Sequence, residues 1–304
     1  MDQPRGTSSP AILIESLTKD YGETRAVDGL SLAVQPGEVV GFLGPNGAGK
    51  STTIRILLDL IRPTAGRAEI LGHDCQEDGV AARQAMGYLP GDLRLYESWT
   101  GREVAEFIAN LRKMGVADSE IGDLARRLDL DLSRKVRAYS KGNRQKLGLL
   151  LALAHRPPVV VLDEPTAGLD PIRQRAVWKL LRERADAGAA VLFSSHVMSE
   201  VEAVCDRVAI LRRGRLLTFG RVSELLAGAP ARLELAFDGE APDLRTVAGV
   251  HALAADGTAV SLQFDGDPND LIQALAKHDL IEVRVHPARL DDVVFDFYER
   301  EEAA

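Results

Sequence analysis

One nine-residue stretch constrains this chain more than any other: residues 44–52, which read GPNGAGKST. The stretch fits the pattern G-x-x-x-x-G-K-[ST], in which a glycine-rich turn joins a buried strand to a helix. Residues 38–43 before it are mostly apolar, and residues 51–61 after it carry apolar side chains at helical spacing. We therefore expect a strand, a tight loop and a helix in this order.

The residue types of this loop indicate its chemistry. Its glycines allow successive backbone N–H groups to point at an anion, and the helix that follows adds its positive end. Lys50 can reach the outer phosphates of a nucleotide, and the Ser51 hydroxyl can ligate Mg²⁺. The alternative is a glycine-rich turn that matches by accident. We predict a site for a nucleoside triphosphate, formed by Gly44, Pro45, Asn46, Gly47, Ala48, Gly49, Lys50, Ser51 and Thr52.

Composition limits the class of protein. With 304 residues, 45% of them apolar, the chain can form one large domain or two unequal ones. Its longest apolar run, residues 149–154, is far too short to span a bilayer. Residues 1–10, which we expect to be flexible, lack an apolar targeting core. Cys75 and Cys205 show no disulfide or metal-ligand pattern. These features predict a soluble, cytosolic protein.

Charge is spread unevenly along the chain. The net charge is −8, but residues 231–304 hold 6 Lys/Arg against 16 Asp/Glu. Residues 1–230 hold the other 31 basic and 29 acidic residues, so this part is nearly neutral. The change indicates a domain boundary near residue 230. We find no basic tail or stripe that favours nucleic-acid binding.

The periodicity differs between the two parts. Residues 101–156 are almost wholly helical, beginning with a capping box of Thr100 and Glu103, and they predict a helical insert in an α/β core. After residue 230 the pattern is a strand, a helix at 243–247, and two strands joined by the hairpin signal Asp256-Gly257. A helix, a strand and a final helix follow. This βαββαβ order predicts a small split-βαβ domain.

Polar residues also follow two of the predicted apolar strands. The apolar residues 159–162 are followed by Asp163 and Glu164. A carboxylate at the end of a strand near a phosphate loop is suited to ordering Mg²⁺. Glu164 could then orient or deprotonate a water molecule. A simple turn at Pro165 is the alternative. His196 ends another strand and is either a structural hydrogen-bonding group or a neighbour of the same phosphate.

Four ordered motifs carry a resemblance to a known family. They are GPNGAGKST at 44–52, YSKGNRQKL at 139–147, VVVLDEPTAGLD at 159–170 and SSH at 194–196. Together, over residues 11–220, the chain resembles the nucleotide-binding subunit of an ABC transporter. The resemblance implies a P-loop NTPase of the ABC type: an α/β domain at 11–227 with a helical subdomain at about 92–157. A small α+β C-terminal domain is expected at 231–304.

The resemblance also implies roles for single residues. Ser51 and Asp163 would hold Mg²⁺ beside bound ATP. Glu164 would act as the general base, and His196 would sense the γ-phosphate. Tyr21 would stack on the adenine, although a core aromatic side chain is an equal alternative.

The signature motif of the family, usually Leu-Ser-Gly-Gly-Gln, reads Tyr-Ser-Lys-Gly-Asn at residues 139–143. In the family this motif completes the ATP site of the opposite subunit, so Ser140, Gly142 and Asn143 are expected to contact the partner's ATP. Lys141 either adds charge there or is simply solvated. Asp170 would lie with residues 167–169 at the dimer seam, or would cap the helix that starts at Pro171.

One position departs from the family pattern. After Gly87-Tyr88-Leu89-Pro90 the family usually has a glutamine that touches Mg²⁺ and links the site to the membrane partner. This chain has Gly91 and then Asp92. Asp92 is either a substitute Mg²⁺ ligand or part of a surface turn.

The resemblance implies an ATP-hydrolysing subunit at the cytoplasmic face of the membrane. It would pair with a second ATP-binding subunit, as a homodimer or with a homologue, and with a separate integral membrane permease. The Ser-Lys-Gly variant is common in exporters of drugs and antibiotics, so the expected cargo is a drug-, antibiotic- or lipid-like compound. Two other classes stay open: a soluble ABC-type ATPase acting on nucleic acid or ribosomes, and a module that senses ATP without turnover.

Overall fold

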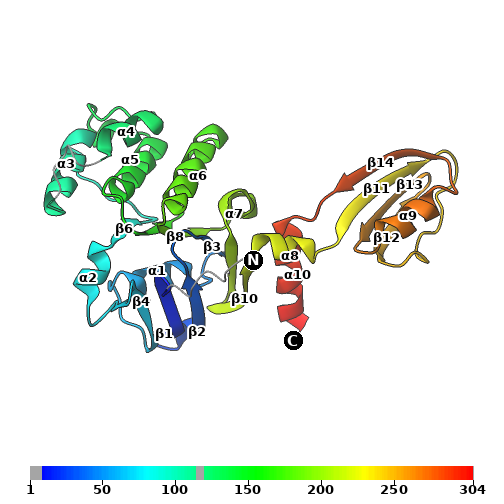
Figure 1. The fold of residues 1–304 in the computed structure, drawn as a ribbon, viewed down its shortest axis with the longest axis horizontal. Helices are drawn as coiled ribbons and strands as arrows, with labels where there is room; N and C mark the ends of the chain where they lie inside the picture. Colours follow the sequence, from blue (N-terminus) through cyan, green and yellow to red (C-terminus); the bar gives the residue numbers. More distant parts are fainter. Residues whose placement is uncertain (1–8, 114–119, 304) are drawn as a thin grey trace, which may run out of the picture. The chain divides into compact units, whose positions relative to one another are not determined.

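The computed structural model describes residues 9–113 and 120–303. The expected flexible segment 1–10 thus lies outside the described residues, apart from its last two. Contacts divide the chain into two compact units, Met1–Gly220 and Arg221–Ala304, called here the first and the second unit. The short helix α8 (Val222–Ala227), placed by the sequence in the ATP-binding domain, belongs to the second unit. Figure 1 shows the helices and strands of both units.

A six-stranded sheet forms the centre of the first unit. Its strands β9, β3, β8, β7 and β6 run parallel to one another. Because parallel strands end at the same edge of a sheet, the segments that follow β3, β7 and β8 meet there. The strand order is β10 (Arg215–Arg221), β9 (Arg207–Arg212), β3 (Val39–Leu43), β8 (Ala190–Ser195), β7 (Val159–Asp163) and β6 (Met86–Leu89).

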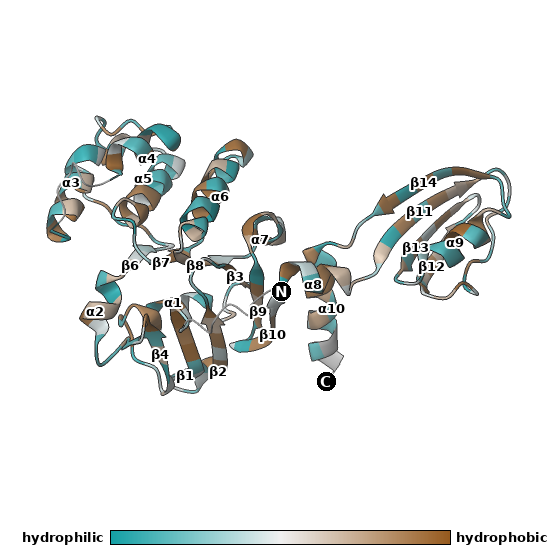
Figure 2. Ribbon diagram, in the orientation of Figure 1, coloured by the Kyte–Doolittle hydropathy of each residue, from teal (hydrophilic) through white to brown (hydrophobic). Residues whose placement is uncertain are grey.

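The first unit also holds an antiparallel sheet. Its apolar side chains pack with helix α1 (Lys50–Leu57) and with the six-stranded sheet in one hydrophobic core. Figure 2 shows the apolar residues of β1 and β2 that contribute to it. The helix ends at Leu57, short of the expected Ile61, and Asp59 follows in a left-handed conformation with φ 54°. The sheet order is β2 (Thr24–Val34), β1 (Ile12–Tyr21), β4 (Ala65–Ile70) and β5 (His73–Asp74).

About half of the described residues between β6 and β7 lie in helices, so the segment is less helical than its sequence pattern predicts. The capping box predicted at Thr100 is confirmed: Thr100 Oγ1 accepts from Glu103 N, and the Glu103 carboxylate accepts from Thr100 N. The helices of this unit besides α1 are α2 (Gly79–Gln84), α3 (Gly101–Leu111), α4 (Ile121–Arg127), the 3₁₀ turn η2 (Val136–Ala138), α5 (Lys141–Leu153), α6 (Pro171–Asp186) and α7 (Met198–Val204).

The second unit is an antiparallel sheet with helices. Leu233, Leu235 and Phe237 of its central strand pack with Leu271 and other apolar side chains in a small core. The strand order is β12 (Val250–Asp256), β13 (Ala259–Phe264), β11 (Ala231–Phe237) and β14 (Leu280–His286), and the helices are α8, α9 (Pro268–Leu275) and α10 (Leu290–Ala303).

The helix predicted at residues 243–247 is wrong. This segment forms turns, in which Asp243 Oδ1 accepts from Arg245 N at 3.0 Å. The Asp243 carboxylate also pairs with the Arg245 guanidinium at 2.9 Å. Aspartate side chains that bond the backbone two residues on compete with helix formation, which explains the turn. The first connection of the predicted βαββαβ order is therefore a loop.

Candidate active site

The predicted phosphate loop joins β3 to α1. Gly49 precedes the helix with φ 102°, and a Cβ atom at this position would lie 2.7 Å from the Ala26 carbonyl oxygen. Only glycine fits both restraints. Gly47 is also left-handed, with φ 82°. The loop thus has the backbone curl that the sequence pattern predicts.

Lys50 is buried, and its ammonium group faces its own loop. Nζ donates to the Gly44 carbonyl at 2.5 Å and to the Pro45 carbonyl at 3.1 Å. Burial lowers the pKa of Lys50, while the negative charges of Glu164 and Asp163 raise it in part. An ammonium group has three N–H donors, so one remains for a further acceptor such as a phosphate oxygen.

A hollow of ≈ 400 Å³ lies over the loop. Its lining includes a cation, the ammonium group of Lys50, and a carboxylate, that of Glu164. The sequence patterns did not single out Arg25 and Arg213, because neither lies in one of the motifs. The lining residues are Thr24, Arg25, Ala26, Asn46, Gly47, Ala48, Gly49, Lys50, Ser51, Thr52, Glu164 and Arg213.

The end of β7 holds both predicted carboxylates, next to the end of β8. Asp163 pairs in register with Ser194, whose hydroxyl donates to Asp163 Oδ1 at 2.5 Å. The same Ser194 oxygen accepts from Glu164 N at 3.0 Å. One serine therefore orients both carboxylate residues, and the sequence had marked it only as part of SSH.

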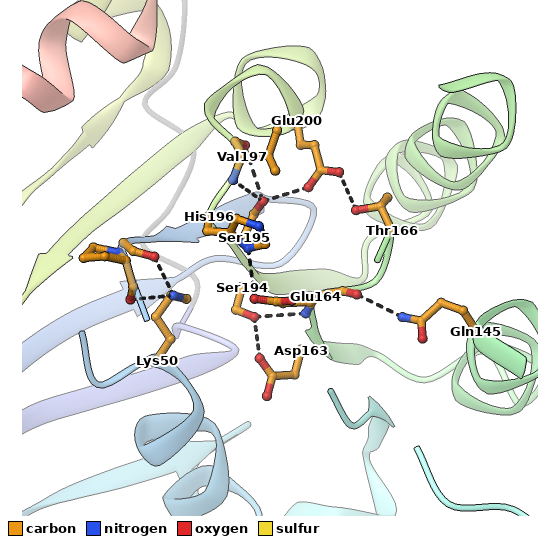
Figure 3. A network of polar contacts seen from close by, with 12 residues as sticks. Lys50, Gln145, Asp163, Glu164, Thr166, Ser194, Ser195, His196, Val197 and Glu200 are labelled. Carbon is orange, nitrogen blue, oxygen red and sulfur yellow. Dashed lines mark hydrogen bonds and ion pairs between the residues drawn. The ribbon is translucent and has the colours of Figure 1, made fainter. Parts of the chain in front are cut away.

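Glu164 and His196 meet at this edge of the sheet (Figure 3). Glu164 Oε1 lies 3.0 Å from His196 Nδ1, and both side chains are partly exposed. Glu164 has φ 51°, an unusual conformation for a non-glycine residue, and Gln145 Nε2 holds its carbonyl at 2.9 Å. Backbone strain of this kind persists where the surroundings fix it and is common at functional sites.

The donor set fits a magnesium ion. Asp163 is buried with one carboxylate oxygen bonded to Ser194, and Ser51 presents an exposed hydroxyl at the start of α1. These are hard oxygen ligands, and Mg²⁺ commonly takes one or two protein ligands together with phosphate oxygens and waters. Within the described residues no group of three or more His, Cys, Asp or Glu forms a protein-only metal cage.

The structure places Tyr21 at the end of β1. Its ring is 47% exposed, and Lys19 Nζ lies 5.1 Å from the ring centre. The alternative that Tyr21 fills the core is therefore wrong. Adenine stacking by Tyr21 stays a prediction.

The signature segment begins α5 and is separate from the hollow. Ser140 caps this helix by accepting from Asn143 N at 3.2 Å, and Gly142 packs closely against Gly168. None of the residues that line the hollow comes from 139–143. Asp170 caps α6 by accepting from Arg173 N at 3.0 Å, as its structural explanation predicts.

The structure shows where Gly91 and Asp92, which depart from the family pattern, lie relative to Asp163. A Cβ atom at Gly91 would lie 3.2 Å from Asp163 Oδ2, so position 91 faces the Asp163 carboxylate. The Asp92 side chain is instead 81% exposed and pairs with Arg94 at 3.1 Å. This arrangement favours a surface turn over a substitute ligand.

Comparisons with known proteins agree with this geometry. The model of the family "ABC transporter" matches residues 27–167. Daunorubicin resistance ATP-binding protein DrrA3 of Streptomyces coeruleorubidus is 40% identical over 221 residues, which cover 71% of this chain and 70% of that protein. Nod factor export ATP-binding protein I of Ralstonia nicotianae is 33% identical over 99% of this chain and 98% of its own length.

A solved structure supports the same assignment. The ATP-binding subunit of an ABC transporter superposes with a TM-score of 0.67 at 30% identity, over 71% of this chain and 91% of that one. The relative from Ralstonia nicotianae spans both units, whereas the solved structure corresponds in length to the larger one. This chain belongs to the ATP-binding, ATP-hydrolysing proteins of ABC transporters.

Proposed function

We propose that this chain hydrolyses Mg²⁺-ATP with Glu164 as the general base and thereby drives an export system. The observation that carries this proposal is the Glu164–His196 pair, 3.0 Å apart, with Glu164 lining the hollow over the phosphate loop. A carboxylate in this place can accept a proton from water as it attacks the terminal phosphate. His196, whose Nδ1 lies 3.0 Å from Glu164 Oε1, would orient this carboxylate.

The remaining roles follow from the positions of the groups. The loop N–H groups and the free donor of Lys50 would bind the phosphates. Hydrogen bonds to a charged phosphate are stronger than those between neutral groups. Ser51 and Asp163 would hold Mg²⁺, which neutralises phosphate charge when bound. Tyr21 would stack on the adenine, with Lys19 beside its ring.

A second copy would complete the site. The signature residues Ser140, Gly142 and Asn143 lie on α5 and outside the hollow, so they are free to serve another chain's nucleotide. The segment 167–170 packs on the same helix start through Gly168. We infer a homodimer, or a dimer with a homologue, that encloses two ATP molecules.

The transport assignment rests on the relatives. Within the described residues, no helix combines the length and apolar character that a membrane span needs. We infer a separate integral membrane permease, which would hold this chain at the cytoplasmic face of the membrane. Two relatives are named for daunorubicin resistance and Nod factor export, and they favour a drug-, antibiotic- or lipid-like cargo.

The test is to purify the tagged full chain from detergent-solubilised membranes. We expect a polytopic membrane protein to accompany it, and the purified complex to hydrolyse ATP faster in lipid vesicles than the chain alone. Stimulation by RNA or ribosomes, with no membrane protein retained, would favour the alternative soluble ATPase. The Lys50→Ala chain serves as the control for contaminating ATPases.

A further inference from the structure

Glu200 is a buried carboxylate to which the proposed function gives no role. It lies on α7 and is 5% exposed. Within the described residues its partners are two hydroxyl groups, and it forms no ion pair there. A carboxylate buried without a cation is costly unless hydrogen bonds satisfy it. The hydrogen bonds from these two hydroxyl groups therefore offset the cost of burying the Glu200 carboxylate.

The two bonds join the two turns that carry the catalytic groups. Thr166 Oγ1 donates to Glu200 Oε1 at 2.5 Å, and Ser195 Oγ donates to Glu200 Oε2 at 2.7 Å. Thr166 lies two residues after Glu164, and Ser195 directly precedes His196. Figure 3 shows Glu200 between Thr166 and Ser195. The carboxylate links the turn after β7 to the turn after β8.

This link works together with the one made by Ser194. Ser195 is fixed further because its Oγ accepts from Val197 N at 2.9 Å. Ser194 joins β8 to β7 through Asp163 and Glu164 N, as described above. With both links in place, the turns cannot shift independently, and the 3.0 Å separation of Glu164 and His196 is maintained.

We propose that Glu200 is a positioning residue for ATP hydrolysis: it holds Glu164 and His196 at their working separation through Thr166 and Ser195. This inference rests on the proposed function of Glu164. Glu200 does not line the hollow over the phosphate loop, so it acts on turnover and not on ATP binding. Removing its carboxylate takes this acceptor from the Thr166 hydroxyl and leaves Ser195 Oγ with the Val197 carbonyl at 3.3 Å. The link between the two turns is then lost.

The test compares Glu200→Ala, Glu200→Gln and Thr166→Val in the full chain. Because small misplacements of reacting groups can lower rates by about 10²-fold, we expect Glu200→Ala to reduce kcat by about 10–100-fold. ATP affinity by calorimetry should stay within about twofold, since Lys50 and the loop are untouched. Glutamine keeps one acceptor, so Glu200→Gln should lose only about 2–10-fold in kcat. Glu202→Gln, on the same helix, is the matched control.

Three further readings decide the outcome. Thr166→Val combined with Glu200→Ala should cost less than the product of the two single losses, because both act through one bond. Thermal unfolding identifies any variant that fails to fold, and Glu200→Gln and Thr166→Val then carry the test. Unchanged kcat in Glu200→Ala, or equal losses in kcat and affinity, would overturn the inference while leaving Glu164 as the base. Near-normal hydrolysis by Glu164→Gln would overturn both.

Discussion

The two units differ in where they keep polar and apolar side chains. All nine residues that are both polar or charged and buried, within the described parts of the chain, lie in the first unit. Most of them stand at the ends of β7 and β8 or on the helices next to them. Both units expose large apolar side chains, but in the second unit several of them line one groove on α9 and β14, such as Ile272 at 61% and Ile281 at 68%.

This difference indicates what each unit is suited to. Buried polar groups are retained only where hydrogen bonds satisfy them, so their concentration at one sheet edge marks an organised site for a charged ligand. Exposed apolar residues on one sheet face mark a contact surface. In the second unit they line a groove of ≈ 960 Å³ between α9 and β14. Chemistry is therefore expected from the first unit alone.

The largest expected effect is the loss of turnover in Glu164→Gln. An amide cannot accept the proton of the attacking water, so hydrolysis should fall by about 10²–10⁴-fold while ATP binding is kept. Phosphate release and calorimetry measure the two quantities. Glu234→Gln, which changes a partly exposed carboxylate in the second unit, is the control and should leave the rate unchanged. A substantial loss in the control would break the comparison between the units.

The stability of the first unit should fall as the pH falls, because it contains a partly buried histidine. Burial lowers the pKa of His155, just after α5, to about 4. Between this value and about 6.5 only the unfolded chain takes up the proton, so stability falls as pH falls through this window. The loss amounts to about 3 kcal/mol in full. His155→Asn should remove this part of the pH dependence, measured by urea unfolding at pH 7 and pH 4.5.

His278 provides the matched control for this change. It is exposed in the second unit, so His278→Asn removes one histidine without changing a partly buried one. An equal change in the two variants would show that burial of His155 is not the cause.

Lys50→Ala tests the cation in the hollow. The change removes a charge-assisted contact to phosphate, worth about 1.5–3 kcal/mol, so ATP affinity should fall by at least about tenfold. Lys179→Ala on the exposed side of α6 is the matched control. Calorimetric titration that gives the same affinity for wild type and Lys50→Ala would exclude the loop as the phosphate site.

A smaller effect is expected at Asp92. Its carboxylate is exposed and paired with Arg94, so Asp92→Ala should change neither the hydrolysis rate nor the Mg²⁺ concentration at half-maximal rate by more than about twofold. Gly91→Ala is the informative comparison, because its Cβ would crowd Asp163 Oδ2. A Mg²⁺ titration of the ATPase rate measures both. A strong shift in Asp92→Ala alone would restore Asp92 as a substitute ligand.

The sequence predicts features that depend on neighbouring residues better than features that depend on residues far apart in the chain. The loop at 44–52, the capping box at Thr100 and the cap at Asp170 are set by local spacing, and the structure has them. The roles of Ser194, Thr166 and Glu200 depend on side chains that meet only once β7 and β8 are neighbours. The segment at 243–247 misled because Asp243 bonds Arg245 instead of starting a helix.

The smallest effect should follow the largest deletion. Every residue that lines the hollow belongs to the first unit, and β10 ends at Arg221. A chain that ends after Arg221 keeps the six-stranded sheet complete and should bind ATP with an affinity within about twofold of the full chain, because domains with their own core can fold alone. A chain that ends after Arg212 is the control. It lacks β10 and Arg213, and should lose folding or ATP binding. Calorimetry with ATP and thermal unfolding separate the two cases. If the chain ending after Arg221 folds but no longer binds ATP, the second unit contributes to the site, and the contrast between a chemical unit and a contact unit is wrong.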